Sequence, residues 1–247
     1  MPKITFTIDV EPDLHTGQYV GITKGLEKAE EIFDKYKIKP ILFVTCDCIE
    51  KHPRIFQRLK KKGWEISLHG YRHKRFDSMS KEESEHAIKK AVSCFQKLLK
   101  IKPKGFRAPQ HSIDSKTLDL LEKYNFEYDS SYAPLNFLQL IFFPKKLSLW
   151  AEQAFSPRNR YKIRKNLTEI PCSSICIPLT SLTFRILPVF ILRAYIFFIK
   201  KLYKEPIFYC HSWDFIKVKG SRIEKYFNHD KFIKKLSKIL ENEKRIP

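Results

Sequence analysis

The sequence predicts a single α/β domain with parallel strands, arranged as a barrel or an open sheet. Short apolar, β-rich runs alternate with stretches of helical periodicity along the 247 residues. No repeat, low-complexity tract or linker divides the chain, and its length suffices for one large core. Charged residues and histidines directly follow several of the apolar runs. In α/β barrels this end of the strands carries the active site.

The individual elements follow from periodicity and from local start and stop signals. The run 41–44 is wholly apolar, as in a buried strand of a parallel sheet. Ser80 and Glu83 have the spacing of a capping box that begins a helix, and Gly63 stops an earlier helix. The predicted strands are 3–10, 41–44, 64–68, 105–107, 128–130 and 206–210. The predicted helices are 21–36, 53–62, 80–100, 115–124 and 229–243.

The chain is strongly basic, because lysine and arginine exceed the acidic residues by 47 − 27 = 20. Such a surplus favours anionic membranes, anionic glycans or nucleic acid, without specificity. The sequence contains no nucleic-acid-binding motif, so we expect no specific nucleic-acid partner. A basic binding module for nucleic acid or anionic glycan is the rival interpretation from outside the enzymes.

The six cysteines have no zinc-finger spacing. Cys46 and Cys48 are separated by one residue, and Cys172 and Cys176 by three. The first strand begins almost directly after Met1, without a secretory signal. We therefore expect reduced, buried and inert cysteines in a cytoplasmic protein.

Residues 134–205 form an apolar elaboration between barrel elements. Within them, 175–203 is rich in Ile, Leu, Phe and Val, but Arg185, Pro188 and Arg193 interrupt any run long enough to span a membrane. Two interpretations stay open: a helix packed in the core, or an interfacial helix in peripheral contact with the anionic inner face of a membrane.

Two histidines and an acidic cluster indicate a metal site. His69 and His73 are spaced i and i+4, which on a helical turn places both imidazoles on one face. Asp9 and Glu11 lie two apart on a strand and therefore point to the same side, with Asp13 close behind. Two imidazoles and one carboxylate leave a coordination position open, which is typical of a catalytic site.

Five segments in order resemble the polysaccharide deacetylase family, the NodB-homology group of carbohydrate esterases. They are 7–11 (Thr-Ile-Asp-Val-Glu), His69-x3-His73, 106–109 (Phe-Arg-Ala-Pro), 128–131 (Tyr-Asp-Ser-Ser) and 211–214 (His-Ser-Trp-Asp), within a resemblance that runs from residue 4 to about residue 216. The resemblance implies a distorted (β/α) barrel of the NodB type over 1–247. It also implies hydrolysis of N-acetyl groups on amino sugars with a divalent metal, commonly zinc.

The resemblance also implies roles for individual residues. His69 and His73 match the metal-binding imidazoles. Family members usually carry adjacent aspartates in the first motif, whereas Asp9 and Glu11 are separated here, as in the branch that includes exopolysaccharide-associated deacetylases. We assign Asp9 as the base and Glu11 as the ligand, with Asp13 as the alternative ligand.

The remaining roles follow from what amide hydrolysis needs. A bound divalent ion polarises the carbonyl and makes hydroxide available at neutral pH. Asp9 takes a proton from water, and Arg107 holds Asp9 ionised. His211, which matches the family's acid, protonates the departing amine, with Asp129 as its expected partner and Asp214 as the second choice.

The expected substrate is an N-acylated amino sugar in a nascent glycan or in a nucleotide- or polyprenyl-linked precursor. Pro109, Tyr132 and Trp213 are the predicted substrate-binding residues, although Tyr132 and Trp213 could instead fill the core, which is the favoured alternative for Trp213. Deformylation or O-deacetylation of a lipid-linked sugar fits the same residues. A catalytically inactive glycan-binding homologue is the further alternative.

Overall fold

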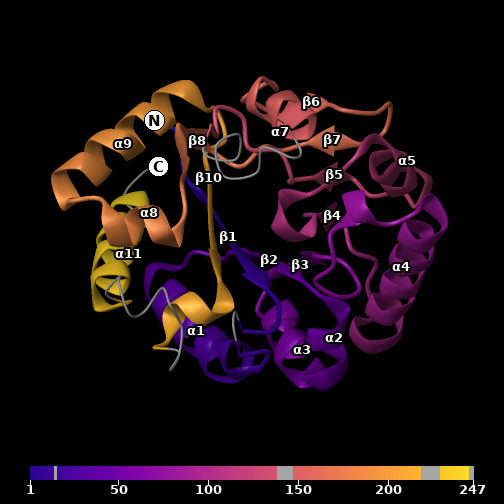
Figure 1. The fold of residues 1–247 in the computed structure, drawn as a ribbon. Helices are drawn as coiled ribbons and strands as arrows, with labels where there is room; N and C mark the ends of the chain where they lie inside the picture. The colour runs from indigo at the N-terminus through magenta and orange to yellow at the C-terminus, as the bar shows by residue number, and fades with distance from the viewer. Residues whose placement is uncertain (14–15, 138–146, 218–228, 245–247) are drawn as a thin grey trace.

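The computed structural model describes residues 1–13, 16–137, 147–217 and 229–244, and its main feature is one eight-stranded sheet (Figure 1). In spatial order its strands are β10 (Ile207–His211), β1 (Thr5–Val10), β2 (Ile41–Val44), β3 (Glu65–Leu68), β4 (Gly105–Phe106), β5 (Tyr128–Asp129), β7 (Thr168–Glu169) and β6 (Tyr161–Lys162). Neighbouring strands are parallel except for β6, which pairs antiparallel with β7.

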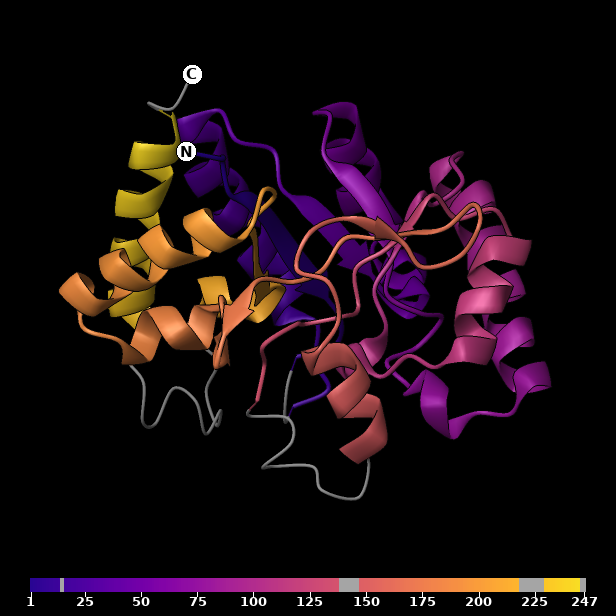
Figure 2. The ribbon, with the colours of Figure 1, turned by 90° about the horizontal axis from the view of Figure 1, so that it is seen from above.

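Helices surround this curled sheet, which gives the distorted (β/α) barrel that the sequence predicts (Figures 1 and 2). Their bounds are α1 (Leu26–Tyr36), α2 (Cys46–Lys51), α3 (Pro53–Lys61), α4 (Lys81–Cys94), α5 (Ser115–Lys123), α7 (Leu147–Ala154), α8 (Ser181–Ile186), α9 (Val189–Leu202) and α11 (His229–Lys244). A small hairpin of β8 (Ser174–Ile175) and β9 (Ile177–Pro178) lies outside the main sheet.

The alternation of β1 explains how polar groups come to lie inside a buried sheet. Phe6 and Ile8 belong to the apolar core, and the ring of Phe6 lies 5.6 Å from that of Phe33 on α1. Thr7 and Asp9 point to the opposite side, because successive strand residues alternate, and both bond Arg107 there. The barrel interior therefore holds charge, while the layer between sheet and helices is apolar.

The structure contains elements that the sequence prediction lacks in two regions of the chain, 46–51 and 134–205. Helix α2 was not predicted; it ends just before Pro53, the first residue of α3. Strands β6 and β7 lie within 134–205 but belong to the main sheet, so this range is not only an elaboration between barrel elements.

Most of residues 175–203 form two helices, α8 and α9, which are joined through Leu187 and Pro188. Among the described residues, no helix combines the length and apolar character needed to cross a membrane. The six cysteines are free thiols, and five are buried as expected. Cys176 is exposed, which corrects the expectation for this residue; it lies in the tight β8–β9 turn at φ 62°.

Candidate metal-dependent active site

The predicted functional residues converge because parallel strands end at one edge of the sheet. Asp9 is the partner of His211 in the register of β1 and β10. His69 follows β3 directly, and Arg107 follows β4. Four strands that are far apart in the sequence thus deliver acidic, basic and imidazole groups to one place.

Glu11, His69 and His73 form a cluster with the geometry of a metal site. One ligand atom from each lies within 4.8 Å of the other two. His73 Nε2 lies against Glu11 Oε2, and His69 Nε2 is 3.9 Å from the same oxygen. His69 Nδ1 is 2.8 Å from the carbonyl oxygen of Arg107. Since a carbonyl can only accept, Nδ1 carries the hydrogen and leaves the Nε2 lone pair for a ligand.

The cluster fits a divalent metal. Glu11 Oε2 is buried and accepts no hydrogen bond of normal geometry from the described residues. A buried carboxylate oxygen left in this way is costly unless it binds a cation. Two imidazole nitrogens and one carboxylate oxygen are the donor set of three-ligand catalytic zinc sites. His73 is about a quarter exposed, so the cluster faces solvent on one side.

The two histidines meet across a loop and not along a helical turn, which corrects the prediction from their spacing. Residues 69–75 contain no helix, and Gly70 adopts φ +93°. A Cβ at Gly70 would lie 3.1 Å from the carbonyl oxygen of Arg72. This left-handed glycine allows the chain to turn sharply after β3 and bring His73 back to Glu11.

Asp13, the alternative ligand, has another task. Its two carboxylate oxygens accept the backbone N–H groups of Val20 and Gly21, each at 2.8 Å. These bonds fix the start of the helical segment that leads into α1. The structure therefore favours Glu11 over Asp13 at the metal cluster.

Asp9 and Arg107 form a buried ion pair at 2.7 Å, as the assignment of Asp9 requires. Arg107 also donates to Thr7 Oγ1, to Ser130 Oγ and to the Ser130 carbonyl oxygen, which fixes its orientation. Burial opposes ionisation of Asp9, but Arg107, with His69 and His211, outweighs burial and lowers the pKa of Asp9 to about 2. Asp9 is therefore a carboxylate at neutral pH and can accept a proton.

His211 has Asp214 as its partner. Asp214 Oδ2 is 3.7 Å from His211 Nδ1 and accepts the His211 backbone N–H at 2.8 Å. The ring of Trp213 stacks on the imidazole with centroids 4.4 Å apart. Burial opposes the charged imidazole, but Asp214 and Glu11 outweigh it and raise the pKa of His211 to about 9. The imidazole therefore carries a proton that it can donate.

The prediction that Asp129 is the partner of His211 is wrong, and the second choice, Asp214, holds that place. Asp129 accepts the hydroxyl of Ser131 at 2.7 Å and hydrogen-bonds Glu169, its register partner on β7. Both carboxyls are fully buried, and burial raises the pKa of each. Asp129 therefore belongs to a structural acid pair inside the barrel.

Two residues at the site were given no role in the sequence prediction. Ser181 Oγ and Arg185 Nη2 of α8 donate to Asp214 at 2.6 and 3.1 Å. They lie 33 and 29 residues before Asp214, in a predominantly apolar segment. Thr7, by contrast, could have been found, because it lies two residues before Asp9 on the same face of β1.

The predicted substrate-binding residues separate into two groups. Trp213 lines a pocket of about 210 Å³ with His211, Tyr209 and the α8 residues Leu182 and Arg185. Tyr132 is buried and donates its hydroxyl to Glu152, which is a packing role. Pro109 is also buried and lies under the loop at Gly70.

The sequence profile of the polysaccharide deacetylases matches residues 2–128, which include Asp9, Glu11, His69, His73 and Arg107. The chain belongs to the polysaccharide deacetylase family. A peptidoglycan deacetylase-like protein of Gibberella zeae is 28% identical over 173 residues, which are 65% of this chain and 49% of that protein. The chain thus spans about half the length of this curated relative.

Solved structures share the deacetylase fold at low identity. A structure from Mycobacterium smegmatis assigned to the polysaccharide deacetylases has a TM-score of 0.70 at 16% identity, covering 98% of this chain and 84% of its own. Puue allantoinase has a TM-score of 0.66 at 14% identity, with 97% and 83% covered. A CE4 family pseudoenzyme from Bacillus anthracis has a TM-score of 0.56 at 12% identity, with 97% and 61% covered. At these identities the likeness concerns the fold alone.

Proposed function

We propose that this chain is a metal-dependent hydrolase that removes N-acetyl groups from amino sugars of a glycan or glycolipid precursor. One observation carries the proposal: the Glu11, His69 and His73 cluster lies beside two ion pairs of opposite character, Asp9 with Arg107 and His211 with Asp214. Asp9 with Arg107 is an ionised base, and His211 with Asp214 is a charged acid. His211 Nε2 is 3.7 Å from Glu11 Oε1, so the acid also reaches the cluster.

The residues divide the chemistry between them. Glu11, His69 and His73 hold a divalent ion, most simply zinc, which when bound supplies Lewis acidity for the acyl oxygen and for water. Asp9 removes the proton as water oxygen bonds to the acyl carbon, and Arg107 holds Asp9 in position. His211 then gives its proton to the sugar nitrogen as the C–N bond breaks, so that acetate and a free amine leave.

The substrate proposal rests on the pocket beside His211 and on the family. Trp213 offers an aromatic wall next to the acid, as sugar sites often do. Family membership supports an N-acetylated sugar, and we extend this to a precursor met in the cytoplasm. Deformylation and O-deacetylation remain the competing reactions, since they use the same water and the same acid. An inactive homologue is the competing role, and the intact acid and base argue against it.

The test is metal content followed by product analysis. Protein purified without a His tag should hold about one divalent ion per chain, by elemental analysis. His73→Ala should lose the ion, whereas His86→Ala, on the exposed side of α4, should retain it. The metal-loaded protein should then release acetate from N-acetylglucosamine oligomers or from lipid-linked N-acetyl sugars. Formate release from N-formyl sugars alone would favour deformylation, and absence of both metal and turnover would refute the hydrolase.

A further inference from the structure

Helices α8 and α9 expose an apolar surface that the catalytic proposal does not use. Seven of the nine exposed large hydrophobic side chains among the described residues lie on these two helices. The most exposed are Phe190 at 74%, Phe198 at 56% and Ile186 at 51%. We call this surface the α8–α9 face. Large apolar side chains left exposed together on two consecutive helices mark an interaction site.

The α8–α9 face is a permanent surface because the opposite side of α9 is anchored. Leu192, Ile196 and Ile199 are buried in the core at helical spacing. Lys200, also buried, bonds Glu243 near the end of α11. Rotation of α9 to hide its phenylalanines would therefore expose core side chains and break a buried ion pair.

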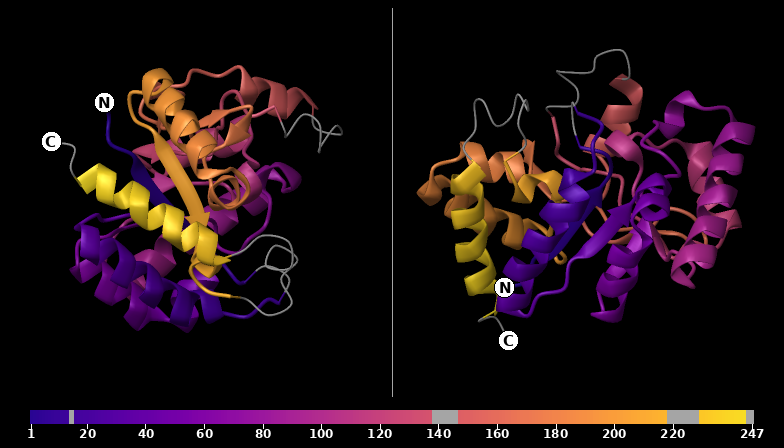
Figure 3. Two further views of the ribbon diagram at one scale, coloured as in Figure 1. Left: turned by 90° about the vertical axis from the view of Figure 1, so that its left-hand side faces the viewer. Right: turned by 90° about the horizontal axis from the view of Figure 1, so that it is seen from below.

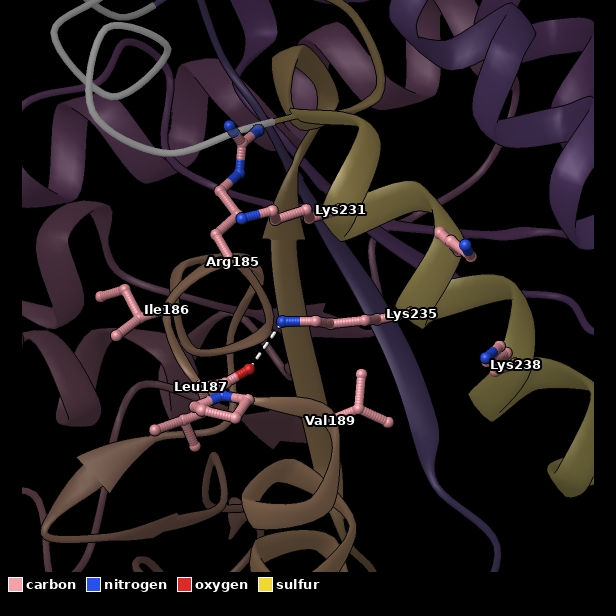
Figure 4. A pocket seen from close by; sticks show the side chains of 9 residues that line it. Arg185, Ile186, Leu187, Val189, Lys231, Lys235 and Lys238 are labelled. Atoms are coloured by element: carbon pink, nitrogen blue, oxygen red, sulfur yellow. Dashed lines mark hydrogen bonds between the residues drawn. The ribbon is translucent and has the colours of Figure 1, made fainter.

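A stripe of lysines borders the α8–α9 face. Helix α11 packs against α8 (Figure 3). Lys231, Lys234, Lys235 and Lys238 line one side of a pocket of about 430 Å³ (Figure 4). The opposite wall runs from Arg185 through Pro188 to Val189. Lys235 donates to the carbonyl oxygens of Phe184 and Leu187 and so holds the end of α8. Lys234 and Lys238 are exposed on the same side of α11.

We propose that the α8–α9 face and the α11 lysine stripe dock this protein onto an anionic membrane surface. Apolar side chains enter the headgroup region, and lysines beside them meet phosphate. Stable peripheral attachment requires two such signals together. A neutral protein partner would cover the apolar side chains but would offer no anionic groups to the exposed Lys234 and Lys238, and the +20 charge of the chain adds to the attraction of an anionic surface.

The position of the docking surface bears on the substrate. Arg185 lines both the lysine-bordered pocket and the pocket that contains His211, and Leu182 lies at the latter's rim. The site thus opens beside the docking surface. Resting on the proposed function, this placement assigns the substrate class: an amino sugar carried on a lipid phosphate in the same membrane.

Vesicle flotation of the full chain tests the docking surface without any assay of activity. The protein should float with vesicles of phosphatidylcholine containing about one third phosphatidylglycerol, and not with phosphatidylcholine alone. The double variants Phe190→Ser/Phe198→Ser and Lys234→Glu/Lys238→Glu should each lose about tenfold or more in vesicle affinity. Raising the salt concentration should weaken the wild type and affect the lysine variant less.

Matched controls isolate the surface. Phe155→Ser removes another exposed phenylalanine, and Lys89→Glu/Lys97→Glu makes the same charge change at exposed positions of α4 and of the helical segment that follows it, Phe95–Leu99. Both should float as the wild type does. Three results would each overturn the docking proposal. The controls could lose as much vesicle affinity as the surface variants, or the wild type could fail to bind anionic vesicles. The protein could also form a dimer that Phe190→Ser/Phe198→Ser dissociates, without binding vesicles. Vesicle binding by a protein without turnover would instead refute the hydrolase and leave docking intact.

Discussion

At the scale of single residues, the proposed base and the proposed acid differ in what surrounds them. Asp9 faces the fully buried guanidinium of Arg107, whereas His211 faces the carboxylate of Asp214. Each neighbour stabilises the charged form of its partner, so the base is deprotonated and the acid is protonated at the same pH. Opposite neighbours thus prepare both groups for one reaction cycle.

Replacing the base should stop turnover and spare the metal. Asp9→Asn keeps the size of the side chain and an acceptor for Arg107, but cannot take a proton from water. We expect kcat to fall about 10²- to 10⁴-fold, the usual contribution of general base catalysis. Metal content by elemental analysis should stay at the wild-type level. Turnover within a few-fold of wild type would show that another group is the base.

The corrected partner of His211 can be tested against the residue that was first expected. Asp214→Asn should lower kcat on N-acetyl substrates about 100-fold, because the acid loses its orientation. The same substitution should lower kcat far less for an ester with a good leaving group, such as 4-nitrophenyl acetate. Asp129→Asn should leave the ratio of amide to ester hydrolysis unchanged. If Asp129→Asn changes that ratio and Asp214→Asn does not, the first assignment was right.

At the scale of elements, the paired strands β5 and β7 hold two titratable carboxyl groups next to each other. Asp129 and Glu169 face each other in parallel register and hydrogen-bond inside the barrel. The folded state keeps a proton on Glu169 that the unfolded chain releases above its ordinary pKa of 4.5. The folded state then binds more protons than the unfolded state, so the pair's contribution to stability declines as pH rises.

Glu169→Gln should remove part of this pH dependence. Gln keeps an acceptor for the Tyr132 N–H and supplies a donor to Asp129 without ionising. We expect the free energy of unfolding, measured by urea at several pH values from 5 to 9, to fall less steeply in the variant than in wild type. The exposed Glu27→Gln on α1 is the control and should keep the wild-type slope. Parallel curves for all three proteins would contradict the prediction.

The sequence was most informative where an element carries its own signal. The wholly apolar β2 and the capping box before α4 were placed within a residue of the observed bounds. Strands β6 and β7, two residues each, were missed because so short a strand has no periodicity to detect and because neither overlaps one of the five motif segments, as the equally short β4 and β5 do. The roles of Ser181 and Arg185 were missed for another reason: tertiary packing alone brings α8 to Asp214.

At the scale of the whole molecule, the metal cluster connects segments that start and end in different elements. Glu11 follows β1, His69 follows β3, and His73 returns from the loop beyond it. An ion bound to all three stabilises only the folded chain. Removing it should therefore destabilise the protein and not merely inactivate it.

Thermal unfolding with and without chelator measures this effect. At a free zinc concentration 100 times Kd, binding should contribute about 3 kcal/mol, which is roughly 5–10 °C in Tm for a chain of this size. EDTA should abolish the gain in wild type. His73→Ala should show a small gain at most, whereas Asp9→Asn should keep it. An equal Tm with zinc and with EDTA in wild type would count against a three-ligand site.

Neighbouring residues of helix α8 serve different surfaces of the molecule. Ser181 and Arg185 hold the partner of the acid, while Leu182 and Ile186, each one residue later, face outward. The outer surface of α8 cannot be replaced independently of the site. An insertion or deletion that shifted the register of α8 would change this surface and would also move both donors away from Asp214. Relatives should therefore keep the spacing of residues within α8 while the outward side chains vary. The outer surface of α8 can change only in ways that leave the two donors beside Asp214.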